Sequence, residues 1–394
     1  MITKYKDLCH LLQLESDSPD FEGLKTFCQA RISNDLIYKG SQREQFEKYT
    51  ALAKHYLDHF LPHCSAENRP IASFKQMTTI QYAADQGYNY YLSNLKHVSL
   101  TMVNQAIPET GMTPLHLAAS SEYLHTIEAL LKLGADPTLS DREGQQPIYT
   151  ALFLPTRFDA DLLQKKEILF RAFSAVTRDG LVHQDKNGDT VFHLMAQHGL
   201  KALLQASLQQ DSRGLFLCNK RTCYPIHIAV LNNQTEVIAL LLKTPNVASL
   251  ADSKGQIALH YAAQYGTTAT VKLCCEMNPE LINQRDKESK TALMLAVEAR
   301  NLEVLQTLID HGADVTLTDY AGSNILHLAI DTMSTKLIEW ILNYTAVDIN
   351  QADNDRETPL AHLYHYYHDQ VSFSKVEQLL REHGAVNGSQ LPSK

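Results

Sequence analysis

Long apolar runs and a leader-like start are both missing from this sequence of 394 residues. No uncharged apolar run reaches the roughly 18 residues that a membrane-spanning helix needs. Asp7 and Glu15 interrupt the beginning of the chain, where a signal peptide would be continuously apolar. We therefore expect no membrane insertion and a protein that folds in the cytoplasm.

Cysteine pairs are missing too. The chain has seven cysteines, an odd number, and no C-x-x-C pair, which argues against a disulfide framework and against a thiolate zinc ribbon. We expect reduced thiols that are mostly buried as small apolar groups. They are Cys9, Cys28, Cys64, Cys218, Cys223, Cys274 and Cys275.

Positive charge is scarce relative to negative charge. Lys and Arg together number 35, Asp and Glu together number 44, and the net charge is -9. Residues 1–77 hold 10 side chains of each sign, so the whole acidic excess lies in residues 78–394. Nucleic-acid binding depends on clustered cations that release counterions from phosphates. The charge balance therefore argues against a nucleic-acid partner.

Motifs of the common catalytic and nucleotide-binding sites are absent. The sequence has no G-x-x-x-x-G-K-[ST], no G-x-G-x-x-G, no H-E-x-x-H and no G-x-S-x-G. We therefore expect a protein that is not an enzyme and uses no cofactor. The alternative is an enzyme whose small catalytic part lies in residues 1–77, where Cys9, Cys28 and Cys64 are the candidate nucleophiles.

An internal repeat fills most of the chain. The heptapeptide TPLHLAA at Thr113–Ala119 recurs in degraded forms at spacings of 33 to 35 residues, with a single spacing of 44. An aspartate five residues before, and a glycine two residues before, accompany most copies. The copies begin at Thr78, Thr113, Gln146, Thr190, Tyr224, Ile257, Thr291, Asn324 and Thr358.

This pattern resembles the ankyrin repeat, whose period is about 33 residues and whose signature is T-P-L-H-x-A. The resemblance implies an all-α fold, an ankyrin-repeat solenoid of about nine helix-turn-helix units, some of them degenerate. We assign residues 78–394 to this domain and residues 1–77 to an N-terminal helical segment that caps the first repeat. Unequal spacings predict insertions near residues 152–166 and 364–371.

The residue chemistry of the repeat agrees with this assignment. Thr113 is suited to cap a helix that Pro114 begins, and the ring of His116 can bond to neighbouring backbone. Gly134 is suited to end the second helix of the same repeat. Repeats that replace the usual Thr or His should lose a cap or a hydrogen bond. The replacements are Gln81, Tyr149, Met294 and Ala361 for His, and Gln146, Tyr224, Ile257 and Asn324 for Thr.

A histidine-rich stretch, HYLDHFLPHC, has a spacing that metal sites use. His55 and His59 are one helical turn apart, and His63 and Cys64 follow Pro62. The alternative is that His55 and His59 flank the apolar stripe of an amphipathic helix, while Pro62 turns the other two side chains away. We favour this second interpretation and assign no metal site.

The resemblance implies that partners dock on a concave face made of hairpin tips and first helices. We therefore expect a protein partner bound by a monomeric chain. Three tyrosines in this set should act as anchors, because aromatic side chains supply much of the energy of interfaces. The partner-binding candidates are Met112, Lys254, Tyr265, Lys287, Lys290, Tyr320, Asp355, Glu357 and Tyr366.

The irregular repeats, the appended segment and the polar tail REHGAVNGSQLPSK are similar to ankyrin effectors that intracellular bacteria inject into host cells. This similarity implies type IV secretion, a host-cell cytoplasmic location and a host protein as the partner. An adaptor that stays in the cytosol of the cell that makes it would have nearly the same sequence features.

Overall fold

The computed structural model describes residues 77–95, 98–121, 123–152 and 179–386. The N-terminal segment with its histidine-rich stretch, residues 153–166 of the expected insertion and most of the polar tail lie outside the described residues. The chain divides into two compact units, Met1–Lys186 and Asn187–Lys394, which are considered separately below.

The described part of the chain is entirely helical, with no strand, as the sequence predicts. Nine helices each begin one residue after the first residue of a heptapeptide, so the phase of the sequence repeat is the phase of the structure. We call these the first helices and name each repeat by its heptapeptide's first residue. They are α5 (Thr79–Asp85), α8 (Pro114–Ser120), α10 (Pro147–Leu152), α12 (Val191–His198), α14 (Pro225–Leu231), α16 (Ala258–Tyr265), α18 (Ala292–Glu298), α20 (Ile325–Asp331) and α22 (Pro359–Tyr366).

A second helix follows most first helices. In the first unit these are α6 (Asn89–Asn94) and α9 (Leu124–Lys132). In the second unit they are α13 (Lys201–Gln210), α15 (Thr235–Leu241), α17 (Thr268–Met277), α19 (Leu302–Asp310), α21 (Thr335–Tyr344) and α23 (Phe373–Glu382). The short α7 (Leu100–Val103) and three 3-10 turns, η4 (Asp179–Leu181), η5 (Arg213–Phe216) and η6 (Pro279–Leu281), complete the described elements.

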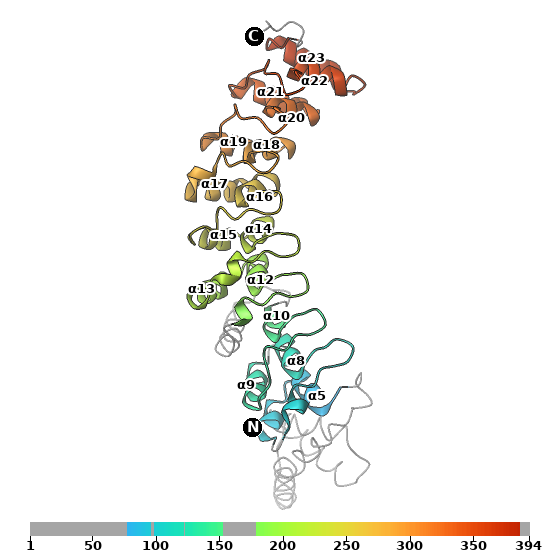
Figure 1. Ribbon diagram of the computed structural model, residues 1–394, viewed down its shortest axis with the longest axis vertical. Helices are drawn as coiled ribbons and strands as arrows, with labels where there is room; N and C mark the ends of the chain where they lie inside the picture. Colours follow the sequence, from blue (N-terminus) through green and yellow to red (C-terminus); the bar gives the residue numbers. More distant parts are fainter. Residues whose placement is uncertain (1–76, 96–97, 122, 153–178, 387–394) are drawn as a thin grey trace, which may run out of the picture. The chain divides into compact units, whose positions relative to one another are not determined.

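Neighbouring repeats pack through corresponding helices. In the second unit α12, α14, α16, α18, α20 and α22 form one continuous row of contacts, and α13, α15, α17 and α19 form another. Figure 1 shows the hairpin loops of this unit projecting from the side of the first helices, away from the second helices. In the first unit α5, α8 and α10 pack in the same order. The cores between the rows are aliphatic: Ile226, Leu293 and Leu326 are each at most 1% exposed.

A buried histidine bonds to the backbone ahead of the next heptapeptide in five of the nine repeats. In the Thr113 repeat, His116 Nδ1 accepts a hydrogen bond of 3.1 Å from the backbone N–H of Thr113, and Nε2 lies 2.9 Å from the carbonyl oxygen of Gln145. The same two contacts recur at the other repeat histidines, which are His193, His227, His260 and His327. All five are at most 1% exposed. The expectation that the His116 ring bonds to neighbouring backbone is confirmed. The second contact also joins this repeat to the next one.

The expectation that replaced caps and histidines lose their bonds is wrong at three positions. Asn324 caps α20 by accepting from the N–H groups of Leu326 and His327. Gln81 makes the same two contacts as the repeat histidines: its Oε1 accepts from Thr78 N–H, and its Nε2 donates to the carbonyl oxygen of Gln105. Tyr149 keeps the bridging bond through its hydroxyl, which donates to the carbonyl oxygen of His183. Polar groups of matching reach therefore substitute for the usual residues.

Glycine ends the second helices where expected. Gly134 has φ 91° and follows α9, and Gly312 and Gly384 have φ values of 94° and 89° after α19 and α23. The next residue in each case donates to the carbonyl oxygen of the residue five earlier, as in Ala135 to Leu130, which is a Schellman closure. A left-handed residue is required here, and glycine adopts it without steric cost.

The described cysteines are mostly buried, as expected. Cys223, Cys274 and Cys275 are buried, whereas Cys218 is exposed and corrects the expectation that it packs. Burial, aided by the neighbouring Cys275 thiol, raises the pKa of Cys274 to about 12. Within the described ranges, none of the helices combines the length and the apolar character that crossing a membrane requires.

Candidate functional site: hairpin tips and first helices of the second unit

Each hairpin of the second unit is closed by a side chain placed five residues before the heptapeptide. In the Ile257 repeat, Asp252 Oδ1 accepts hydrogen bonds of 2.8 Å from the backbone N–H groups of Lys254 and Gln256. The corresponding side chains of other hairpins accept one or both of these bonds. They are Asn219, Asp286, Asp319 and Asp353.

The hairpin tips are joined to one another by backbone hydrogen bonds. Lys287 N–H donates to the carbonyl oxygen of Lys254 at 2.9 Å, and Tyr320 N–H donates to that of Glu288 at 2.8 Å. Asn354 N–H donates to the carbonyl oxygen of Ala321 at 2.9 Å and so joins the last tip to the series. The tips therefore form an ordered row, so a partner that binds there does not have to order separate loops.

A glycine two residues before the heptapeptide permits this close approach. Gly322 has φ 81°, and a Cβ atom there would lie 2.8 Å from Asn354 Oδ1 and 2.9 Å from its backbone nitrogen. Three hairpins of the unit hold a larger residue in the same left-handed conformation. These are Thr222, Ser289 and Arg356, with φ values of 62°, 59° and 65°.

All three candidate tyrosines present large exposed rings. Tyr320 lies at a hairpin tip and is 80% exposed, while Tyr265 and Tyr366 are 55% and 56% exposed. Tyr265 and Tyr366 end α16 and α22 at the same position of the repeat, eight residues after the heptapeptide's first residue. Each ring lies one helical turn after a side chain that faces its hairpin: the Tyr261 hydroxyl donates to Asp252, and His362 faces Glu357. Both rings therefore lie on the helix face turned toward the hairpins.

The three candidate lysines differ in their availability to a partner. Lys254 is exposed at a tip, and Lys287 Nζ donates a hydrogen bond of 2.7 Å to the carbonyl oxygen of Ser253. Lys290 is held within the repeats, with Nζ 2.8 Å from a carboxylate oxygen of Glu298 and 3.1 Å from one of Glu288. Its side chain is 20% exposed. Burial acts to lower the pKa of Lys290, but the two carboxylates outweigh it and raise the pKa.

The acidic candidates lie on the last hairpin. Asp355 is exposed, whereas the Glu357 side chain is 20% exposed, with His365 Nδ1 2.6 Å from its Oε1. His362 lies on the same helix, and its Nε2 is 2.7 Å from Asp331 Oδ1. Burial alone would lower the pKa of His362, but the bond to Asp331 and the nearby carboxylates outweigh it and raise the pKa. Glu357 therefore takes part in a charged cluster within the last two repeats.

Met112 lies in the first unit, apart from the other candidates. It is half-buried before α8, where its carbonyl oxygen accepts a 2.9 Å hydrogen bond from Ile107 N–H and its own N–H donates to Thr110. Eight of the nine candidates thus belong to one unit, and Met112 belongs to the other.

Family models match two parts of the chain. Residues 110–142 match a model described as "Ankyrin repeat", and residues 226–319 match one described as "Ankyrin repeats (3 copies)". The chain contains ankyrin repeats. The matched ranges lie within the helix-turn-helix units described above, with Lys254, Tyr265, Lys287 and Lys290 inside the longer one.

Proteins of several organisms are similar to this chain, and some of them have ankyrin repeats in their names. The chain is 31% identical over 198 residues to the chicken "Nuclear factor NF-kappa-B p105 subunit", covering 48% of this chain and 20% of that protein. It is 27% identical over 181 residues to the human "Ankyrin and armadillo repeat-containing protein", covering 44% and 13% of the two chains. The chain therefore spans a small part of the length of these relatives. Among solved structures, the ankyrin repeat domain of Bcl-3 is 24% identical with a TM-score of 0.49, covering 59% of this chain and 98% of that one.

Ankyrin repeats indicate a protein–protein interaction module. The rival expectation, an enzyme with a catalytic part in residues 1–77, falls on residues outside those the structure describes.

Some residues of the ankyrin hairpin row were missed by sequence reasoning. Lys220 and Arg221 are exposed at the tip of the Tyr224 repeat, in line with Lys254 and Lys287. Counting back three and four residues from the heptapeptide at Tyr224 would have found them. The contact of His362 with Asp331 joins two repeats and has no signal within either one alone.

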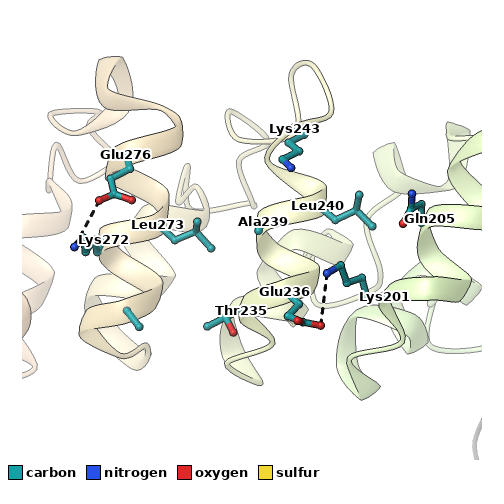
Figure 2. A pocket seen from close by; sticks show the side chains of 11 residues that line it. Lys201, Gln205, Thr235, Glu236, Ala239, Leu240, Lys243, Lys272, Leu273 and Glu276 are labelled. Carbon is teal, nitrogen blue, oxygen red and sulfur yellow. Dashed lines mark ion pairs between the residues drawn. The ribbon is translucent and has the colours of Figure 1, made fainter. Parts of the chain in front are cut away.

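A groove lies on the other side of the ankyrin stack, between the second helices α13, α15 and α17. It has a volume of about 620 Å³, and Figure 2 shows the half-buried Leu240 and Leu273 among its lining side chains. Ion pairs of 3.7 Å lie along it, Lys201–Glu236 and Lys272–Glu276. Most of the charged side chains that line the groove are paired, and none of its described lining side chains is aromatic. The groove therefore offers a partner fewer anchors than the hairpin side.

Proposed function

We propose that the second unit binds a protein partner through its hairpin tips and the exposed ends of its first helices, and that it has no catalytic role. The single observation that carries this proposal is the exposure of Tyr265, Tyr320 and Tyr366 on one side of an ordered stack. Large exposed aromatic side chains are costly to leave in water and supply much of the binding energy when a partner covers them.

The scaffold beneath these rings supports the same role. The tips are joined by backbone hydrogen bonds, and in four repeats of this unit a buried histidine bonds to the backbone ahead of the next heptapeptide. A partner that docks across several repeats therefore meets side chains whose backbone is already fixed, and the entropy lost on binding is smaller.

The charges on this face favour a partner with a defined orientation. Exposed cations prevail at the tips of the Tyr224 and Ile257 repeats, Lys287 is balanced by Glu288 at the Thr291 tip, and on the last hairpin carboxylates outnumber Arg356. The cations are Lys220, Arg221, Lys254 and Lys287, and the carboxylates include Asp355 and Glu357. A partner with an acidic region followed by a basic region matches this order, because complementary charges fix orientation and speed association.

Affinity capture from cell lysate, with recovered proteins quantified by mass spectrometry, tests the proposal. We compare the intact chain with a triple variant, Tyr265→Ala, Tyr320→Ala and Tyr366→Ala. The matched control is Tyr344→Ala, which removes an equally large ring, 69% exposed, from the second helix α21. We expect the control to recover the partner and the triple variant to recover about tenfold less or worse.

A further variant separates the two sides of the stack. Leu240→Asp with Leu273→Asp places charges in the groove between the second helices. Loss of the partner from this variant, together with full recovery by the triple tyrosine variant, would assign binding to the groove and refute the proposed surface.

We also propose that the partner is a protein of a host cell into which a bacterium delivers the chain. The support is the sequence alone: the irregular repeats, the appended segment and the polar residues around Leu391. The test fuses a cytosol-activated adenylate cyclase to the chain in a bacterium that has a type IV secretion apparatus. Cyclic AMP should rise in infected cells and should not rise when the apparatus or residues 387–394 are deleted; a signal independent of both contradicts the proposal.

A further inference from the structure

A mixed cluster of carboxylates and imidazole lies where α22 meets the last hairpin. Asp353, Glu357 and His362 each offer one ligand atom, and these three atoms lie within 4.8 Å of one another. His362 Nδ1 and Glu357 Oε2 are 3.7 Å apart. That separation is too long for a hydrogen bond and leaves these two groups facing each other without one.

The other ring nitrogen of His362 is firmly held. Its Nε2 donates to Asp331 Oδ1 at 2.7 Å, because a carboxylate oxygen can only accept. The same Asp331 oxygen accepts from the hydroxyl of Tyr367 at 2.9 Å. In the neutral ring Nδ1 then carries the lone pair. Nδ1 is buried and has no hydrogen-bond partner among the described residues.

The same positions of the Ile257 repeat are filled differently. There Tyr261 stands where His362 stands, and its hydroxyl donates to Asp252 Oδ2 at 2.9 Å. Gln256 stands in place of Glu357. In that repeat a hydroxyl therefore satisfies the hairpin aspartate, and the Gln256 amide donates to Asp286 of the next hairpin at 3.2 Å. The last repeat replaces this arrangement by a buried nitrogen lone pair and a second carboxylate.

We propose that Asp353, Glu357 and His362 bind a divalent transition-metal ion of the zinc type. Two ligands about 2.0–2.2 Å from a tetrahedral ion lie roughly 3.3–3.5 Å apart, so the 3.7 Å between His362 Nδ1 and Glu357 Oε2 needs only a small adjustment. The three ligand atoms lie within 4.8 Å of one another, so a pair that includes Asp353 must close by up to about 1 Å more on binding. The two carboxylates balance the charge of the ion. A ring nitrogen among the ligands favours zinc over calcium or magnesium, which prefer oxygen alone.

Asp331 positions the ring of His362 in this proposed site. A metal-binding histidine usually donates its other ring N–H to a carboxylate, which fixes the ring and makes the bound nitrogen more basic. Asp331 meets that description through its contact with His362 Nε2. The fourth position of the ion is left for water or for His365, whose Nδ1 is 2.6 Å from the other Glu357 oxygen.

Zinc affinity of the full chain, measured by competition with a chromophoric chelator at pH 8, tests the proposal. The repeats supply substitutions that keep the fold at each position. Asp353→Asn copies Asn219, Glu357→Gln copies Gln256, and His362→Tyr copies Tyr261. We expect the intact chain to bind one equivalent of zinc that each variant binds at least about tenfold more weakly. The control His368→Gln, which changes a histidine 62% exposed outside the cluster, should leave this equivalent unchanged.

Cobalt(II) gives a second measurement that does not depend on the variants. Bound at this site it should show the d–d bands of a four- or five-coordinate ion without a thiolate charge-transfer band, because no sulfur is among the ligands. A thiolate band, loss of the equivalent only in a His55→Ala and His59→Ala variant, full retention in His362→Tyr, or no bound zinc at all would each overturn the proposal.

Discussion

Replacing His227 by glutamine should make the protein less sensitive to acid. Burial is the main cause that lowers the pKa of His227 from 6.5 to about 4. The folded pKa lies below the unfolded one, so the unfolded chain takes up a proton first as the pH falls. The stabilisation is complete above pH 6.5 and is lost between about pH 6.5 and 4.

The size of the effect follows from the two pKa values. One pKa unit corresponds to about 1.4 kcal/mol, so the full loss is about 3 kcal/mol, of which about 2 kcal/mol falls between pH 7 and pH 5. Glutamine can keep both bonds that His227 makes, with Tyr224 N–H and the Leu250 carbonyl oxygen. Gln81 shows that geometry in the Thr78 repeat, and an amide does not titrate in this range.

Urea unfolding followed by circular dichroism at pH 7, 6 and 5 measures the difference. We expect the free energy of unfolding of His227→Gln to fall by about 2 kcal/mol less than that of the intact chain between pH 7 and pH 5. The control His125→Gln changes a histidine whose side chain is 77% exposed and should follow the intact chain. Equal pH dependence of His227→Gln and the intact chain would refute the reasoning.

Three further predictions concern caps, turns and thiols. Asn324→Ala removes two bonds that cap α20 and one to the Asp348 carbonyl oxygen, and it should lower the free energy of unfolding by about 1–2 kcal/mol in urea titrations; an unchanged midpoint would contradict the capping role. Ser289→Gly relieves a left-handed residue at φ 59° and should raise the thermal midpoint, by a gain of about 0.5–1 kcal/mol, whereas a lower midpoint would show that the turn is not strained. Iodoacetamide at pH 8 should modify the exposed Cys218 of the folded chain well before Cys274, whose pKa burial raises to about 12; peptide mapping checks the order, and equal rates would contradict the described burial.

The helical phase could be predicted from the sequence because it depends on local signals repeated many times. A cap, a first-turn proline and an apolar run recur at nearly equal spacing, and all nine first helices begin where this phase places them. The hairpin turns are equally local, since each needs one aspartate or asparagine and a left-handed residue. A cap or proline that is missing from one repeat is present in others, so the start of every first helix can still be predicted from the repeat spacing.

Side-chain contacts were harder to predict than the positions of the helices. Asn324 and Gln81 keep bonds that a signature-based comparison counts as lost, because an amide reaches the same donors and acceptors as threonine or histidine. The position of Lys290 two residues after a hairpin tip predicts an exposed side chain, yet Lys290 forms an ion pair with Glu298 at the end of the same repeat's first helix. The contact between His362 and Asp331 needs residues 31 positions apart and becomes visible only when the repeats are stacked.

Hydrogen–deuterium exchange of the full chain with and without its captured partner tests the proposed surface most directly. The account predicts slower exchange on binding at the tips around residues 253–256, 287–290 and 320–323, and at the ends of α16 and α22. Slower exchange confined to the second helices α13, α15 and α17, with these tips unchanged, would contradict it.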